Sequence, residues 1–397
     1  MTVGRPSDET TFSRVASSLD LDEIRRRTAE ARPTDLARWT AGSPVADRDL
    51  PALFSPAAGE GLEALARRAS ALTERRFGRV IQLFAPLYLT NECVNKCSYC
   101  GFSFDNDIRR RTLTSEEIEQ EVDGLADAGF RHVLLVAGES NRHLPPSAVA
   151  DATRAAARRF ASIAVEIAPQ EIEEYALFES AGVDGVVVYQ ETYDPDIYRA
   201  VHTKGPKTRY GWRLDAVERA AAAGIRSLGI GALLGLGDWR LEAVMIALHA
   251  RHLSRTAWRA RIAISFPRIR SAAGEFEAPC PVSDREFVHL LTAMRIAVPD
   301  AELVVSTREP ASLRDSLIGL GITRMSAGSR TEPGGYGAPD ESEPQFDIAD
   351  HRPPSEVAAA IAARGFEPVW KDFDRELTPS LENLVGEGAA MRGAAPR

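Results

Sequence analysis

Eight short apolar runs, each joined to the next by a helical pattern, dominate the sequence from residue 80 onward. The helical segments end alike, with Gly129, Gly182, Gly224 and Gly321 just before the next apolar run. Strands that alternate with helices in this way pair in parallel, and eight of them can close a barrel. The sequence therefore predicts an α/β fold, a (β/α)8 barrel of the TIM type. Strands are expected at 82–88, 132–137, 162–168, 185–189, 227–233, 261–266, 302–307 and 323–326.

The sequence predicts three parts along the chain. Residues 1–79 are expected to form a helical N-terminal extension, residues 80–375 the barrel domain, and residues 376–397 a short flexible C-terminal tail. One helix of the barrel is sharply defined. Thr114 and Glu117 predict a capping box at its start, and Ile118, Val122 and Leu125 repeat at helical spacing.

Charge and hydropathy exclude several classes of protein. The net charge of -9 does not favour binding to nucleic acid or to an anionic membrane. No run approaches the roughly 20 apolar residues of a membrane helix, and residues 1–9 lack the apolar core of a signal peptide. Four cysteines in 397 residues do not make a disulfide framework, so a reducing cytoplasm is the expected location.

Three of the cysteines, Cys93, Cys97 and Cys100, are spaced C-x-x-x-C-x-x-C on one short segment, and Cys280 lies far along the chain. Three such thiolates can hold three irons of a cubic iron–sulfur cluster and leave the fourth iron open. An open iron can bind a ligand and pass it an electron, which favours chemistry over simple electron relay. Structural zinc is the alternative, but it needs a fourth Cys or His nearby, and residues 88–131 contain no histidine.

Polar residues collect where the predicted strands end, which in a parallel barrel is the mouth that carries the chemistry. A strand end is also polar simply because it meets water, so each residue has a purely structural alternative. Arg308 is the strongest candidate, since a fixed guanidinium suits a bidentate carboxylate. Gln190 and Glu191 are expected either to hydrogen-bond a ribose or to tie neighbouring loops together. The full set is Tyr88, Gly138, Glu139, Glu166, Gln190, Glu191, Pro267, Arg268, Arg308, Glu309 and Ser326.

The cysteine motif resembles the signature of the radical S-adenosylmethionine enzymes, which have this spacing and an aromatic residue, here Tyr99, before the third cysteine. Further runs resemble the aromatic amino acid lyase branch of that family, and most closely its tyrosine lyases of thiamine thiazole synthesis. They lie between residues 80 and 375, at 87–93, 188–193, 229–233, 265–270, 306–310, 333–336 and 369–373.

The resemblance implies a role for each matching residue. A [4Fe-4S] cluster would be held by Cys93, Cys97 and Cys100. S-adenosylmethionine would be contacted by Tyr99, Gly138, Glu139, Glu166 and Gln190. The amino and carboxylate groups of an amino acid substrate would be gripped by Tyr88, Arg308 and Ser326.

The activity that the resemblance implies is cleavage of the Cα–Cβ bond of L-tyrosine to 2-iminoacetate and p-cresol. L-Tryptophan or another aromatic amino acid is the alternative substrate, and an iron–sulfur electron-transfer protein is the non-enzymatic alternative. A relative that makes hydrogenase ligands carries an added C-terminal cysteine cluster, whereas no cysteine follows Cys280 here. The expected partners are a flavodoxin- or ferredoxin-type reductant and a thiazole synthase. Arg109, Arg110 and Arg111 are expected to form a solvated turn or a docking surface for the reductant.

Overall fold

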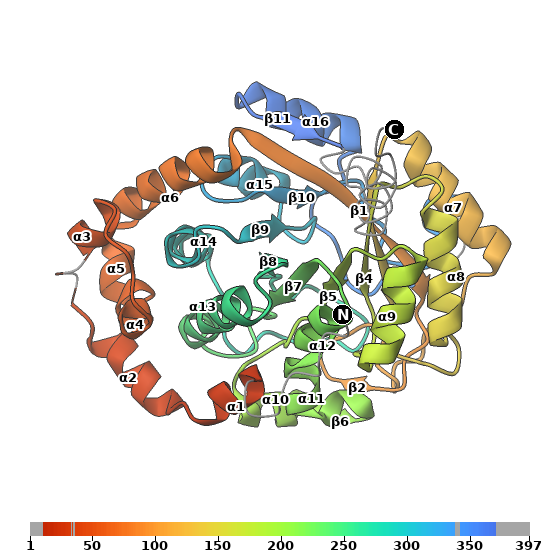
Figure 1. Cartoon of the computed structure of the whole chain (residues 1–397), viewed down its shortest axis with the longest axis horizontal. Coiled ribbons are helices and arrows are strands. Elements are labelled where there is room, and N and C mark those ends of the chain that lie inside the picture. The colour runs from red at the N-terminus through yellow and green to blue at the C-terminus, as the bar shows by residue number, and fades with distance from the viewer. Residues whose placement is uncertain (1–10, 33, 35, 338–341, 371–397) are drawn as a thin grey trace, which may run out of the picture.

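The computed structural model describes residues 11–32, 34, 36–337 and 342–370, and its centre is a closed barrel of eight parallel strands (Figure 1). Strand β1 closes the barrel, because it pairs in parallel with both β3 and β10. The predicted (β/α)8 barrel is confirmed. Its strands are β1 Val80–Thr90, β3 His132–Ala137, β4 Ser162–Glu166, β5 Gly185–Val187, β7 Ser227–Gly231, β8 Arg261–Ser265, β9 Glu302–Val305 and β10 Arg324–Ser326.

Every predicted run forms a strand, and the differences lie at the ends. Five of the eight strands stop one or two residues earlier than predicted, because the chain turns into the loops of the barrel mouth. Three short strands were not predicted: β2 Lys96–Cys97, β6 His202–Lys204 and β11 Glu367–Val369. Strands β2 and β6 pair antiparallel outside the barrel, and β11 adds to the first residues of β1.

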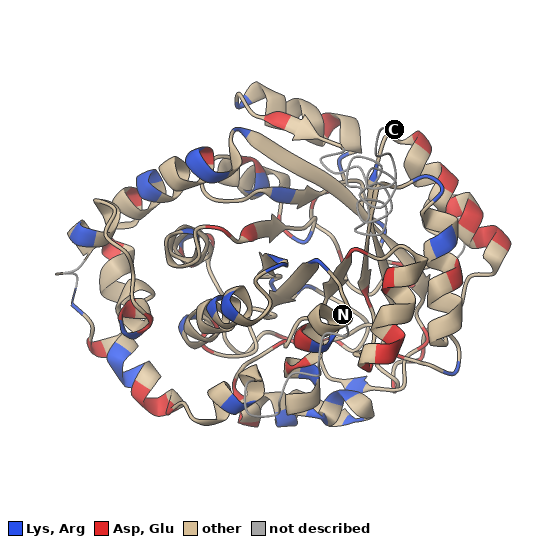
Figure 2. Ribbon diagram, viewed as in Figure 1, with Lys and Arg blue, Asp and Glu red and all other residues tan. Residues whose placement is uncertain are grey.

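Helices cover the outside of the barrel, and positions of charged residues of both signs are interspersed along them (Figure 2). The predicted capping box begins α7: the Glu117 N–H donates to the Thr114 hydroxyl at 3.3 Å, and the Thr114 N–H donates to the Glu117 carboxylate at 2.8 Å. A cap of this kind contributes about 1 kcal/mol. The helices are α7 Ser115–Asp127, α8 Pro146–Ala156, α9 Ile172–Ala181, α10 Pro195–Val201, α11 Tyr210–Leu214, α12 Ala216–Ala222, α13 Trp239–Thr256, α14 Asp284–Ala297, α15 Ala311–Leu317 and α16 Pro354–Ala363.

The N-terminal helices form an arc along one side of the barrel (Figure 1). In this arc α6 packs against α14, and α2 and α4 pack against α13. The tail expected at 376–397 and the end of the 369–373 run lie outside the described residues. Among the described residues, no helix is long and apolar enough to cross a membrane. The helices of the arc are α1 Phe12–Ser17, α2 Leu21–Glu30, α3 Leu36–Thr40, α4 Leu50–Leu53, α5 Pro56–Glu60 and α6 Leu62–Phe77.

The register of the strands brings side chains from several strands to one pocket at the barrel mouth. Tyr88 of β1 pairs with Val136 of β3, which in turn pairs with Glu166 of β4. On the other side of β1, Phe84 pairs with Ser326 of β10. All five side chains line one pocket at the carboxyl ends of the strands. The mouth of the barrel is therefore where the predicted site residues Tyr88, Glu166 and Ser326 come together.

Candidate active site

The segment that follows β1, residues 91–111, carries the three cysteines and is called the cysteine loop below. Hydrogen bonds within this loop fix its shape. The Cys97 N–H donates to the Ser103 hydroxyl at 3.1 Å, and the Ser103 N–H donates to the Cys100 carbonyl at 3.0 Å. The Phe104 N–H donates to the Asn95 carbonyl at 2.8 Å. None of the cysteines among the described residues forms a disulfide. The fold thus presents three free cysteines on one compact loop.

The surroundings of these thiols suit metal ligands. Burial raises the pKa of Cys93 to about 11 and also raises the pKa of Cys97 and Cys100, and Lys207 only partly opposes this at the latter two. A buried thiolate therefore needs a stronger positive charge beside it, which bound iron supplies. Three such ligands on one loop fit three irons of a [4Fe-4S] cluster.

The exit of β3 supports the cysteine loop. Gly138 approaches it so closely that a Cβ atom there would lie 2.4 Å from the carbonyl oxygen of Glu92, so only glycine fits. The Gly138 N–H donates to the Thr90 carbonyl at 2.9 Å, and the Val94 N–H donates to the Glu139 carbonyl at 3.1 Å. The structure therefore places both Gly138 and Glu139 against the cysteine loop.

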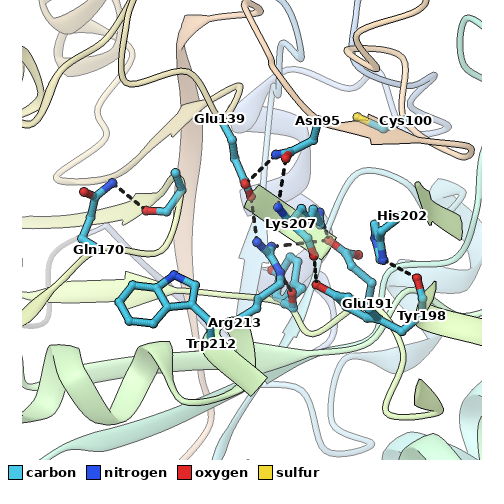
Figure 3. Close-up of polar contacts among 12 residues, drawn as sticks. Asn95, Cys100, Glu139, Gln170, Glu191, Tyr198, His202, Lys207, Trp212 and Arg213 are labelled. Carbon is cyan, nitrogen blue, oxygen red and sulfur yellow. Dashed lines mark hydrogen bonds and ion pairs between the residues drawn. The ribbon is translucent and has the colours of Figure 1, made fainter. Parts of the chain in front are cut away.

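A buried network of charged side chains surrounds Glu139 (Figure 3). Its carboxylate accepts from Arg213 Nη1 and from Asn95 Nδ2, each at 2.7 Å. Lys207 Nζ donates to Glu191 Oε1 at 2.8 Å, and Arg213 Nη2 lies 3.6 Å from the same oxygen. Burial opposes ionisation of the two carboxylates, yet the two cations hold the pKa of each below its ordinary value. The charges of two carboxylates and two cations thus neutralise one another in the interior.

This network joins the cysteine loop to the crossover between β5 and β7, residues 188–226. The Lys207 N–H donates to Asn95 Oδ1 at 3.0 Å. Gly205, with a φ of 89°, comes so close that a Cβ atom would lie 2.3 Å from that same oxygen. Strand pairing also aligns Cys97 of β2 with His202 of β6. The Glu191 carboxylate contacts Lys207 and Arg213 of its own crossover, and the network reaches the cysteine loop through Lys207 and Asn95.

Tyr99 is anchored on the same crossover. Its hydroxyl lies 2.7 Å from Nε2 of His202, whose Nδ1 lies 2.8 Å from the Tyr198 carbonyl oxygen. Because a carbonyl oxygen only accepts, Nδ1 carries the proton and Nε2 accepts from Tyr99. Burial lowers the pKa of His202 to about 2, so the ring stays neutral. The aromatic residue before the third cysteine therefore has a defined partner (Figure 3 shows His202 and Tyr198).

Arg110 supports the cysteine loop from within. Its guanidinium donates to the backbone carbonyls of Asn91, Phe102 and Ser103 at 2.7 to 2.9 Å. Arg111 donates to a carboxylate of α7 at 2.7 Å. The prediction of a solvated turn is therefore wrong for these two arginines, because backbone carbonyls and a neighbouring helix engage their charges.

Four predicted site residues from four strands or their ends, Tyr88, Glu166, Arg308 and Ser326, line the pocket at the barrel mouth. The guanidinium carbon of Arg308 lies 3.3 Å from the centre of the Phe346 ring, which orients its planar fork. The Ser326 hydroxyl oxygen accepts from a backbone N–H at 3.1 Å, so its own proton remains for another acceptor. The pocket therefore offers a cation and a hydroxyl donor suited to a carboxylate.

Two further groups can interact with a polar ligand: Glu166, which lines this pocket, and Gln190, which follows β5. Burial, together with the charge of Glu191, raises the pKa of Glu166 to about 7, although Arg308 opposes the shift. Gln190 Oε1 is buried and has no hydrogen-bond partner among the described residues, while its Nε2 donates to the Tyr210 carbonyl at 3.5 Å. A buried carbonyl oxygen costs free energy unless a donor reaches it, so Gln190 suits a ligand hydroxyl.

Sequence reasoning missed several residues that hold this site. Lys207 and Arg213 did leave a signal, because residues 204–213 form a basic stretch in an acidic chain, inside a long crossover. Asn95 and His202 have no motif of their own. Gln345 is the most distant, since its contact with the cysteine loop spans 245 residues.

Comparison with known proteins agrees with this site. The family model of the Radical SAM superfamily matches residues 87–247, and that of the Biotin and Thiamin Synthesis associated domain matches residues 265–367. The chain is 41% identical to 2-iminoacetate synthase of Escherichia coli (strain K12) over 94% of this chain and 100% of the relative. It is 40% identical to the Salmonella typhimurium enzyme of the same name over 92% and 97%. The structure matches the [FeFe]-hydrogenase maturase HydG from Carboxydothermus hydrogenoformans with a TM-score of 0.83 and 33% identity, over 91% of this chain and 84% of that one.

The barrel and its cysteine loop define a radical S-adenosylmethionine enzyme, a class that works with a [4Fe-4S] cluster and S-adenosylmethionine. Within that class, the chain belongs to the 2-iminoacetate synthase family. The zinc site and the non-enzymatic electron-transfer protein are therefore set aside as interpretations of the cysteine motif.

Proposed function

We propose that the protein is a carbon–carbon lyase that cleaves the Cα–Cβ bond of L-tyrosine to 2-iminoacetate and p-cresol for thiamine thiazole synthesis. The observation that carries the proposal is the 40–41% identity to 2-iminoacetate synthases over nearly the whole chain. The pocket supports it, because Tyr88, Arg308 and Ser326 all line it and Tyr88 belongs to a cluster against which Cys93 and Cys100 pack.

When bound, the cluster and S-adenosylmethionine supply a 5′-deoxyadenosyl radical that takes one hydrogen atom from the substrate. Arg308 and Ser326 would hold the substrate carboxylate, and Tyr88 would accept from its amino group. This clamp would direct an amino hydrogen towards the radical at the near-attack distance of about 3 to 3.5 Å. Loss of that hydrogen atom permits the Cα–Cβ bond to break. The departing hydroxybenzyl fragment then takes up one electron and one proton to leave as p-cresol.

The cofactor contacts follow from the same arrangement. Gln190, with its buried acceptor, and Glu166 are proposed to contact the ribose of S-adenosylmethionine. Tyr99, Gly138 and Glu139 are proposed to seat the remainder, chiefly by holding the cysteine loop and the exit of β3 in place. A binding site that backbone contacts and an ion network already hold in shape changes its conformation little when the ligand binds. The free-energy cost of ordering the site is therefore small.

Two protein partners complete the proposal. Each turnover needs one electron to cleave the cofactor and one for the benzyl fragment, so a flavodoxin- or ferredoxin-type reductant is required. The imine product hydrolyses readily in water, which favours its direct use by a thiazole synthase. Free thiols at the site are best preserved in the reducing cytoplasm.

The test is an anaerobic assay of reconstituted enzyme with S-adenosylmethionine, a reductant and either L-tyrosine or L-tryptophan. We expect p-cresol and glyoxylate, the hydrolysis product of 2-iminoacetate, from tyrosine in equal amounts. Cleavage of tryptophan but not tyrosine would assign the protein to the alternative substrate. Formation of 5′-deoxyadenosine with neither amino acid cleaved would contradict the lyase activity itself.

A further inference from the structure

Gln345 contacts the substrate pocket and the cysteine loop at the same time. Its Oε1 lies 2.8 Å from the hydroxyl of Tyr88, and its Nε2 lies 3.7 Å from Sγ of Cys100. One amide group therefore bridges a residue of the proposed substrate clamp and a ligand of the proposed cluster. The local sequence does not predict this bridge, because the two contacts join residues that are 257 and 245 positions apart.

The backbone fixes the position of this amide. The Gly101 N–H donates to the Gln345 carbonyl at 3.1 Å, and the Gln345 N–H donates to the Thr331 carbonyl at 2.9 Å. A Cβ atom at Gly101 would lie 2.4 Å from the Gln345 carbonyl oxygen, so the two segments touch. The next residue, Phe346, lies under the Arg308 guanidinium. Residues 345 and 346 thus support the substrate clamp on two sides.

The donor and acceptor roles of the three groups fix the direction of each hydrogen bond between Tyr88, Gln345 and Cys100. A cysteine sulfur that ligates iron is a thiolate, which can only accept, so the amide nitrogen of Gln345 must face Cys100. The amide oxygen then faces Tyr88, and the Tyr88 hydroxyl must donate its single proton to it. The lone pairs of the Tyr88 oxygen are left for a donor in the pocket. An amino group is such a donor, whereas a carboxylate is not.

We infer that Gln345 is a positioning residue that couples substrate binding to the cluster by a relay from the substrate amino group through Tyr88 to Cys100. This inference rests on the proposed function only for the identity of the substrate. A hydrogen bond to a cluster sulfur stabilises the reduced, more negative state and raises the reduction potential. Donation by a substrate amine to Tyr88 strengthens the following bonds of the chain, because linked hydrogen bonds polarise one another. Substrate binding therefore favours cluster reduction, and by reciprocity reduction favours substrate binding.

The test is a redox titration of reconstituted holoenzyme, followed by electron paramagnetic resonance with and without L-tyrosine. We expect Gln345→Leu to lower the ratio of reduced to oxidised cluster at a fixed potential by about threefold to tenfold, where tenfold equals 59 mV for one electron. The upward shift that tyrosine causes in the parent enzyme should vanish in this variant. Gln120→Leu, at an exposed position of α7, is the matched control and should leave the titration unchanged.

Two further variants separate the halves of the relay. Gln345→Glu is isosteric and still accepts from Tyr88 but offers no donor to the sulfur, so the potential should fall while tyrosine affinity stays within about twofold. Tyr88→Phe keeps the contact between Gln345 and Cys100 but removes the hydroxyl that polarises it, so the substrate-free potential should fall less than in Gln345→Leu while tyrosine affinity falls.

Three outcomes decide the inference. If Gln345→Leu keeps its full iron content, its potential and its tyrosine affinity, the relay is overturned. If that variant loses iron, the isosteric Gln345→Glu decides in its place. If the parent enzyme fails to cleave tyrosine but the substrate-free potentials of the Gln345 variants still fall, the relay to the cluster stands and the proposed function fails.

Discussion

Glu166 carries a cost to stability that should be visible as a pH dependence. Its folded-state pKa is raised from 4.5 to about 7 by burial first and by Glu191 second. The cost is absent below the unfolded pKa, grows as the pH rises, and is complete above the folded pKa. The difference corresponds to about 3 kcal/mol, since each tenfold change in proton affinity is worth about 1.36 kcal/mol. Glu166→Gln removes the carboxylate and should therefore stabilise the protein most at alkaline pH.

The measurement is the free energy of unfolding of parent and variant across a pH series, without S-adenosylmethionine or substrate. The stability gained by Glu166→Gln should increase by about 2 to 3 kcal/mol between about pH 5 and pH 8. Glu179→Gln, at an exposed position of α9, is the control and should show no such trend. A gain that is equal at both pH values, or a variant less stable than the parent at pH 8, would refute the reasoning. If the predicted trend is found, the retention of so costly a carboxylate marks Glu166 as a functional group.

Three other predictions test the site. Cys97→Ala should abolish cleavage of S-adenosylmethionine while Cys280→Ala preserves it, and loss of iron in both variants would contradict the assignment of three ligands. Arg308→Lys keeps the charge but loses the fork, so tyrosine turnover should fall at least about tenfold more than uncoupled formation of 5′-deoxyadenosine, whereas equal losses would move Arg308 to the cofactor. Gly205→Ala should cost about 1 to 3 kcal/mol and lower the iron content, compared with Gly78→Ala, which has a similar φ but no neighbouring atom within 4 Å. Equal iron content in the two glycine variants would argue against the close contact.

Local pattern was enough to predict the barrel. Its strands are buried on both faces, so they appear in the sequence as short apolar runs with a helix and a glycine between them. The ends of the strands were less well placed, since the polar residues of the mouth can belong to a strand or to a loop. Tyr88, Arg308 and Ser326 were found by this rule, and the structure brings them into one pocket.

The supports of the site could not be predicted in the same way. Strands β2 and β6 are two and three residues long, too short to show an alternating pattern. Arg110 looked like one of three solvated charges, but the backbone carbonyls around it belong to a loop whose path the sequence does not reveal. Gln345 is a single polar residue in an irregular segment. Contacts between segments this far apart depend on the closed barrel, and no local preference encodes them.

The supports of the cysteine loop bear on the order in which the protein matures. The loop leaves the ribosome early, yet Cys97 pairs with His202 and Gly101 rests on Gln345, which are synthesised much later. Domains fold as units, so a nascent chain that ends before β10 has neither a closed barrel nor the last support of the loop. Iron delivered at that stage would meet three mobile thiols. We therefore expect cluster assembly to follow folding of the barrel, so that iron and sulfide are delivered to ligands that are already in place.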